Sequence, residues 1–187
     1  MPAENDTILI VDDEPHVISA LIRGLDEEPY QVIGRPGGAE ALQLMEGQSF
    51  KVVISDERMP GMDGAEFLAQ VKVRYPEAIR IMLTGHASVE ATMRAVNRGE
   101  IYRFFTKPWD EIELKLAIRS ALEKYDLEQE NRRLLRTVRR QSQEIRYLER
   151  SFPGISELRR DTDGAIRLDA EVTDDEIARI IAECNAG

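Results

Sequence analysis

Five polar side chains stand directly after apolar runs that resemble buried strands. Asp12 and Asp13 follow the first run, Asp56 follows the third, and Thr84 and Lys107 end the fourth and fifth. In an open parallel sheet, ligands gather beyond the carboxyl ends of the strands. Three carboxylates that meet there repel one another, and a hard divalent cation such as Mg²⁺, which prefers oxygen ligands, relieves the repulsion.

This set of groups is suited to a phosphoryl group. The three carboxylates are nearly neutralised by Mg²⁺ and the Lys107 ammonium, and both cations bind phosphoryl oxygens. An oxygen of Asp56 can attack phosphorus and form an acyl phosphate, while Thr84 donates a hydrogen bond to a phosphoryl oxygen. Each motif alone also fits a plain structural role, because an Asp-Asp pair often caps a helix and a Lys-Pro pair often ends a strand. The combination therefore carries the prediction.

Strand-like and helix-like patterns alternate along the first part of this chain of 187 residues. The sequence predicts strands within 7–13, 30–34, 50–56, 78–85 and 101–108, with helices within 15–28, 38–47, 64–76, 88–100 and from about 109. Five strand-helix units in series predict an α/β fold, with a parallel sheet covered by helices on both faces.

The last helix is expected to continue far beyond the sheet. No Pro or Gly interrupts the chain from Glu111 to about Arg150. Its distal part carries a heptad pattern with Leu127, Leu134, Gln141 and Leu148 in one column and Asn131, Val138, Ile145 and Phe152 in the other. A lone Asn at a core position often fixes a parallel two-stranded register. We therefore expect a homodimeric coiled coil over 123–152; the alternative is a charged helix folded onto its own domain.

The residues that follow predict a small α+β tail over 153–187. A hairpin is expected with its turn at Asp163-Gly164, and a helix capped by Thr173 follows it. A segment of this size rarely folds alone, so it is expected to dock on another surface. The expected domains are thus 1–122, 123–152 and 153–187.

Composition excludes several classes of protein. The net charge of -10 argues against coating nucleic acid or anionic membranes, and no apolar run is long enough to span a bilayer. The basic segment "RRLLRTVRR" is expected to be the solvated flank of a helix. The single cysteine, Cys184, and the absence of a visible secretory signal lead us to expect a cytoplasmic location.

Four motifs give residues 8–122 a close resemblance to the CheY-like receiver domain of two-component response regulators. They are "ILIVDDEP", "VVISDERMPGMDG", "IMLTGHA" and "FFTKPW". The resemblance implies a doubly wound, flavodoxin-like sheet of order 2-1-3-4-5. It implies that a histidine kinase phosphorylates Asp56, and that Asp12, Asp13, Asp56 and the backbone carbonyl of Arg58 hold Mg²⁺.

The resemblance also implies a switch. Thr84 and Lys107 would bind the phosphoryl group, and Phe104 matches the switch aromatic, at which the family often has Tyr. Haloacid-dehalogenase-like phosphatases also use an aspartate nucleophile at a strand end, but they need a second Asp where this chain has Arg58. That reading is rejected.

The output is open to three interpretations. The first is a signalling adaptor, not an enzyme, that catalyses only its own phosphorylation and dephosphorylation and binds an unknown downstream protein through its coil and tail. The second is the receiver and linker of an enzyme-output regulator, of the cyclic-dinucleotide phosphodiesterase or transcription-activator type. The third and least favoured is a regulator that binds nucleic acid through the basic segment.

Overall fold

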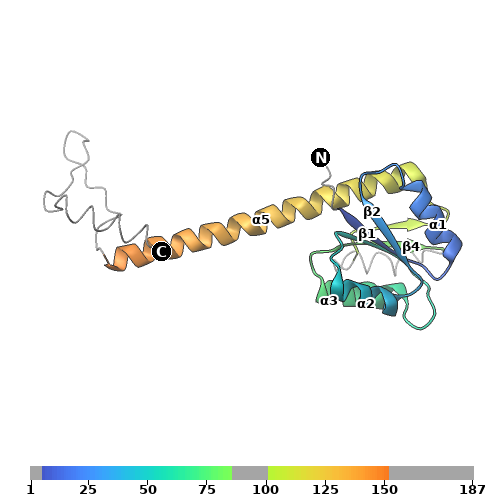
Figure 1. Cartoon of the computed structure of the whole chain (residues 1–187), viewed down its shortest axis with the longest axis horizontal. Helices are drawn as coiled ribbons and strands as arrows, with labels where there is room; N and C mark the ends of the chain where they lie inside the picture. The colour runs from blue at the N-terminus through green and yellow to red at the C-terminus, as the bar shows by residue number, and fades with distance from the viewer. Residues whose placement is uncertain (1–5, 86–100, 152–187) are drawn as a thin grey trace, which may run out of the picture. The chain divides into compact units, whose positions relative to one another are not determined.

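The computed structural model describes residues 6–85 and 101–151, and the chain divides into two units, Met1–Arg132 and Arg133–Gly187. The strands are β1 (Thr7–Val11), β2 (Gln31–Arg35), β3 (Val52–Asp56), β4 (Ile79–Thr84) and β5 (Arg103–Thr106) (Figure 1). The helices are α1 (Pro15–Gly24), α2 (Gly38–Gly47), α3 (Gly64–Arg74) and α5 (Glu111–Ser151). The helix expected over 88–100 and the tail expected over 153–187 lie outside the described residues.

The five strands form one parallel sheet in the order β2-β1-β3-β4-β5. This confirms the doubly wound fold and the strand order that the sequence resemblance implied. Strands β1 and β3 are buried almost throughout, which explains why "TILIV" and "VVISD" are such apolar runs. The strand order reverses between β1 and β3, so their carboxyl ends border the crevice where sheets of this kind bind ligands.

Alternate strand residues enter two separate cores, one on each face of the sheet. On one face, α1 and the first part of α5 contribute Leu21 and Ile118 to a core that contains Ile10. On the other face, α2 and α3 lie side by side and contribute Met45 and Phe67 (Figure 1). Burial of one such side chain stabilises the fold by about 1.5–3 kcal/mol. The well-packed cores on the two faces of the sheet therefore hold the carboxyl ends of the strands in place.

Helix α5 is one element of 41 residues, as its lack of Pro and Gly predicts. Its first part buries Leu114, Ala117, Ile118, Ala121 and Leu122. Polar contacts continue to Arg132, because Glu77 accepts hydrogen bonds from Gln129 Nε2 and Arg132 Nη1, both at 2.7 Å. The domain boundary at 122 stays a prediction, and these contacts place part of α5 beyond it against the sheet unit. None of the described helices has the length and apolarity needed to cross a membrane.

Candidate functional site

Four of the predicted site residues meet at the carboxyl edge of the sheet. Asp56 and Thr84 end β3 and β4, while Asp12 and Lys107 directly follow β1 and β5. The backbone N–H of Lys107 donates to the carbonyl of Thr84 at 2.7 Å, and the N–H of Glu57 donates to the carbonyl of Leu83 at 2.8 Å. The sheet ladder thus continues into the site and fixes where these side chains begin.

Lys107 joins the two buried carboxylates. Its Nζ lies 2.7 Å from Asp12 Oδ2 and 2.5 Å from Asp56 Oδ1. Asp12 is fully buried and Asp56 is 6% exposed, so water screens this interaction only weakly. One ammonium therefore faces two carboxylates, and the pairing leaves an excess of negative charge.

The pKa values reflect this arrangement. Burial raises the pKa of Asp12, although hydrogen bonds from Lys107 and from the N–H of Glu14 oppose the shift. Burial alone lowers the pKa of Lys107, but its hydrogen bonds to Asp12 and Asp56 raise it above the ordinary value. The site therefore keeps a charged ammonium and disfavours the ionised form of Asp12, so it would gain from a further cation.

The structure gives less support to the other two predicted metal ligands, Asp13 and the backbone carbonyl of Arg58. Asp13 is exposed, and so is the side chain of Arg58, whose backbone N–H donates to Asp56 Oδ2 at 2.7 Å. Within 6–85 and 101–151, no three acidic, histidine or cysteine side chains form a group ready to hold a metal ion. The Mg²⁺ ligand set therefore stays a prediction.

Glu57 is a site residue that sequence reasoning missed. The hydroxyl of buried Thr84 donates a hydrogen bond to Glu57 Oε2. This interaction places a carboxylate beside the threonine that was predicted to bind the phosphoryl group. The only sequence signal was the position of Glu57 directly after Asp56, and the sequence does not show in which direction the side chain of a loop residue points.

The "MDG" part of the second motif is explained by packing. A Cβ on Gly64 would lie 1.9 Å from the carbonyl oxygen of Asp56, so a side chain cannot fit there without backbone movement. The N–H of Gly64 donates to the carbonyl of Glu57 at 2.9 Å. Asp63 caps α3 by accepting a hydrogen bond from the N–H of Glu66 at 2.7 Å. The loop is thereby held against the end of β3.

A cavity of about 190 Å³ opens beside Asp56. Its lining consists of Glu14, Asp56, Glu57, Arg58, Gly85 and Lys107. It therefore combines the predicted nucleophile, the ammonium and two further carboxylates. Such a hollow admits a small anionic group only when positive charge accompanies it.

Phe104 lies in β5, opposite Met82 of β4, and is partly buried against the core shared with α2 and α3. It is therefore next to the strand that ends in Thr84. This placement fits an aromatic side chain that responds to movement of the threonine, and the switch itself stays a prediction.

Comparisons with known proteins agree with this geometry. The family model described as the response regulator receiver domain matches residues 8–119. The hydrogenase transcriptional regulatory protein HoxA of Cupriavidus necator is 38% identical over 134 residues, which cover 72% of this chain and 28% of that protein. The C4-dicarboxylate transport transcriptional regulatory protein DctD of Pseudomonas aeruginosa is 33% identical over 182 residues, which cover 96% of this chain and 37% of that protein.

A solved structure shares the fold as well. The signal receiver domain of an HD domain-containing protein from Pseudomonas fluorescens Pf-5 is 38% identical, with a TM-score of 0.65, over 70% of this chain and 96% of that chain. The chain spans well under half of the length of HoxA and DctD. The sheet order and the family match agree, and the chain belongs to the response regulator receiver domain family.

Proposed function

We propose that Asp56 is the phosphoacceptor of this response regulator and that a histidine kinase is the donor. The observation that carries the proposal is the contact of Lys107 with both Asp12 and Asp56, beside a cavity at the switch point of the sheet. Asp56 Oδ1 contacts the ammonium and Oδ2 accepts the Arg58 N–H. The carboxylate is thereby oriented before any phosphoryl donor arrives.

The transfer is a displacement at phosphorus. A carboxylate oxygen of Asp56 attacks the phosphorus of a phosphohistidine, the P–O bond forms, and the P–N bond breaks with its electron pair going to the imidazole. Lys107 holds a phosphoryl oxygen as the ammonium leaves its present position on Asp56. Thr84 exchanges its hydrogen bond to Glu57 for one to the phosphoryl group.

The carboxylates fit the Mg²⁺ on which receiver domains generally depend. Asp12, Asp13, Asp56 and the backbone carbonyl of Arg58 would hold it, because they supply the hard oxygen ligands that this ion prefers. When bound, Mg²⁺ neutralises the acidic cluster and holds phosphoryl oxygens. The excess negative charge around Lys107 and the raised pKa of Asp12 support this assignment.

The consequence of phosphorylation is a population shift that reaches α5. Phosphorylation favours a state with Thr84 drawn toward the phosphoryl group and Phe104 turned inward. Thr84 and Thr106 are paired in register at the ends of β4 and β5, and α5 follows shortly after β5. A conformational change at the ends of β4 and β5 therefore occurs close to the start of α5, which we call the output helix.

The output helix is proposed to form a homodimer over 123–152, with a downstream protein as the further partner. Leu127, Leu134, Val138 and Ile145 are between 53% and 72% exposed in the single chain. They lie seven, four and seven residues apart along α5, as members of a heptad seam do. A second copy of the same helix would bury them.

Labelling tests the phosphoacceptor proposal. The chain is incubated with acetyl phosphate, with and without Mg²⁺, and the phosphorylated fraction is separated on a phosphate-affinity gel. We expect labelling with Mg²⁺ only, loss of labelling in Asp56→Asn, and full labelling in the exposed-site control Asp26→Asn. Equal labelling of Asp56→Asn would overturn the assignment.

A second candidate is the receiver and linker of a transcription-activator-type regulator. The similarity to DctD covers 96% of this chain, so it extends beyond the receiver domain into the region of the coil and tail. An antibody against residues 6–85 separates the two candidates in cell extract. A native product much longer than 187 residues favours the regulator, and one of this length favours the adaptor.

A further inference from the structure

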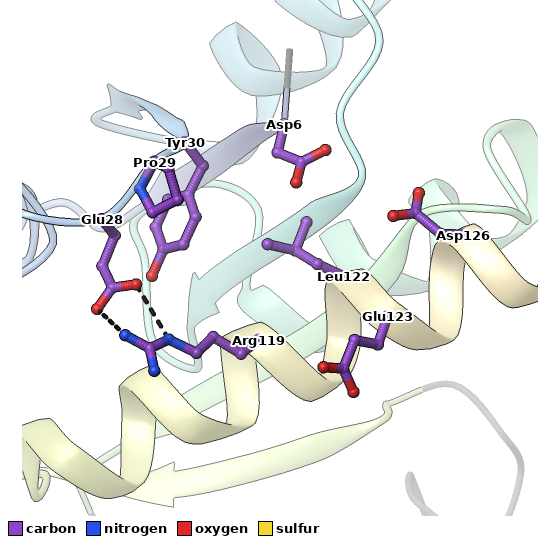
Figure 2. A pocket seen from close by; sticks show the side chains of 8 residues that line it. All are labelled: Asp6, Glu28, Pro29, Tyr30, Arg119, Leu122, Glu123 and Asp126. Carbon is purple, nitrogen blue, oxygen red and sulfur yellow. Dashed lines mark hydrogen bonds and ion pairs between the residues drawn. The ribbon is translucent and has the colours of Figure 1, made fainter. Parts of the chain in front are cut away.

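A second and larger hollow lies at the amino ends of β1 and β2, at the edge of the sheet away from Asp56. Its volume is about 400 Å³, within the range of sites for small molecules. It is lined by Asp6, Glu28, Pro29, Tyr30, Arg119, Leu122, Glu123 and Asp126 (Figure 2). The lining comes from the residue before β1, the loop before β2 and one side of α5.

Two polar atoms in this hollow have no hydrogen-bond partner in the described part of the chain. They are Asp6 Oδ2 and Tyr30 Oη. Asp6 is fully buried, and its Oδ1 lies 2.5 Å from Lys51 Nζ. A buried carboxylate oxygen or hydroxyl without a partner is costly and rare in native proteins. Two such atoms in one hollow indicate a missing ligand.

The charge of the hollow indicates the sign of that ligand. Lys51 Nζ is shared between Asp6 Oδ1 at 2.5 Å and Asp126 Oδ1 at 2.6 Å, so one ammonium serves two carboxylates. Arg119 is engaged with Glu28 through two hydrogen bonds of 2.8 and 3.1 Å. Glu123 adds a further carboxylate to the lining (Figure 2). The lining thus carries more negative than positive charge, and a cation fits it.

The rest of the lining indicates an apolar part of the ligand. Leu122, Pro29 and the ring of Tyr30 form an apolar wall, and the carboxyl group of Asp6 lies across from Leu122 (Figure 2). Burial raises the pKa of Tyr30, and the charge of Glu28 raises it further. The phenol therefore stays neutral, and its ring adds apolar surface to the hollow.

We propose that this hollow binds a small organic cation with an apolar stem, of the alkylamine or alkylguanidinium class. Its head group donates hydrogen bonds to Asp6 Oδ2, and its stem lies against Leu122 and the ring of Tyr30. The site is separate from the phosphoacceptor site and does not depend on it. Because α5 supplies one wall, the ligand adds a contact between the output helix and the base of the sheet.

Titration of the full chain with two probes of the same shape tests the site. Butylguanidinium carries a charge, whereas butylurea is its neutral counterpart. Amide resonances of Tyr30 and Leu122 are followed by NMR, up to a probe concentration on the order of 10 mM, which detects Kd values near 1 mM. We expect butylguanidinium to shift both resonances and butylurea to bind at least about tenfold more weakly, since a charge-assisted hydrogen bond is lost.

Variants fix the location of binding. Asp6→Asn is expected to weaken butylguanidinium binding about tenfold, whereas Asp56→Asn and Asp26→Asn leave it unchanged. Tyr30→Phe keeps the apolar wall and the acidic groups, so it is expected to leave binding unchanged, and it should not lower the melting temperature of the free chain because the lost hydroxyl has no partner. The proposal is overturned if butylguanidinium shifts neither resonance, if butylurea binds equally well, or if Asp6→Asn binds as the original chain does.

Discussion

Asp12 is a predicted metal ligand whose burial is expected to lower the stability of the free chain. Burial raises its pKa in the folded chain, so its ionised form is disfavoured there. A carboxyl group with a raised folded pKa contributes most to stability at low pH, and this contribution is lost as the pH rises through the folded pKa. At pH 7, the ionised form of Asp12 therefore destabilises the free chain, and Lys107 offsets only part of this cost.

Asp12→Asn is expected to stabilise the free chain at pH 7 by roughly 0.5–2 kcal/mol, the usual size of a stabilising substitution. The gain should shrink as the pH falls toward 3.8, the ordinary pKa of the group, because the original side chain then becomes neutral too. Urea unfolding at several pH values measures this, with Asp26→Asn as the exposed control. A gain that stays constant with pH would contradict the role given to burial.

Mg²⁺ is expected to raise the stability of the original chain relative to that of Asp12→Asn. A ligand at ten times its Kd stabilises the folded state by about 1.4 kcal/mol. Mg²⁺ is therefore expected to raise the melting temperature of the original chain and to leave that of Asp12→Asn nearly unchanged. Equal shifts in both would remove Asp12 from the metal site.

Glu57 offers a second prediction for a single residue. Its carboxylate accepts the hydrogen bond of Thr84 and lines the cavity that we propose receives the phosphoryl group. Glu57→Gln removes the negative charge and is expected to speed phosphorylation by acetyl phosphate by about three- to tenfold, since an unfavourable charge interaction of about 1 kcal/mol is lost. The exposed Glu46→Gln is the control. A slower rate in Glu57→Gln would show that the carboxylate assists transfer.

The candidate site shows where sequence reasoning succeeds and where it ends. Asp12, Asp56, Thr84 and Lys107 were predictable because a parallel sheet brings all strand ends to one edge. The pairing of Thr84 with Glu57 was not, because it depends on side-chain direction in a loop. The acidic hollow at Asp6 was also missed, since it joins β1, a loop and α5, which lie far apart in the sequence.

At the scale of elements, the turn between β3 and α3 depends on one glycine. A Cβ on Gly64 would meet the carbonyl oxygen of Asp56 at 1.9 Å, whereas nothing lies within 4 Å of a Cβ on Gly47 at the end of α2. The contact at Gly64 involves backbone, so it cannot be relieved by a rotamer change. The position of Asp56 and the start of α3 are thereby tied together.

Gly64→Ala is expected to destabilise the chain by about 1–3 kcal/mol, the usual cost of overpacking. It should also slow phosphorylation, because the end of β3 must move. Gly47→Ala, the matched control, is expected to be neutral or slightly stabilising, since Ala favours a helix over Gly. Urea unfolding of both variants measures the difference, and equal stabilities would contradict the contact.

The strands and helices themselves were largely predictable. Continuous apolar runs such as "VVIS" fit strands buried on both faces, and the heptad-bearing segment forms α5 as expected. Strand β5 is shorter than expected, at Arg103–Thr106, and Lys107 follows it instead of ending it. The apolar run continues beyond the ladder because Ile101 packs in the core from outside the strand.

At the scale of the whole molecule, the proposed output depends on the association of two chains through α5. Leu134 lies on the predicted seam and Leu135 lies beside it, and the two are 55% and 52% exposed in the single chain. They therefore form a matched pair for the same substitution. Leu134→Lys is expected to weaken the dimer at least about tenfold, the effect of a buried charge at a core position, whereas Leu135→Lys changes it less.

Sedimentation equilibrium of the original chain and both variants measures the dimer constant. A monomeric original chain would contradict the proposed homodimer. Equal weakening by both substitutions would place the seam elsewhere on the helix. Repeating the measurement on the phosphorylated chain shows whether the receiver controls association.

The most direct test of the central claim is to locate the acyl phosphate chemically. The chain is phosphorylated by acetyl phosphate with Mg²⁺ and reduced with borohydride, which converts a phosphorylated aspartate into homoserine, and its peptides are sequenced by mass spectrometry. The account predicts homoserine at position 56 and at no other aspartate, with none when Mg²⁺ is omitted. Homoserine at Asp12 or Asp13, or equal conversion of Asp56 without the metal, would contradict it.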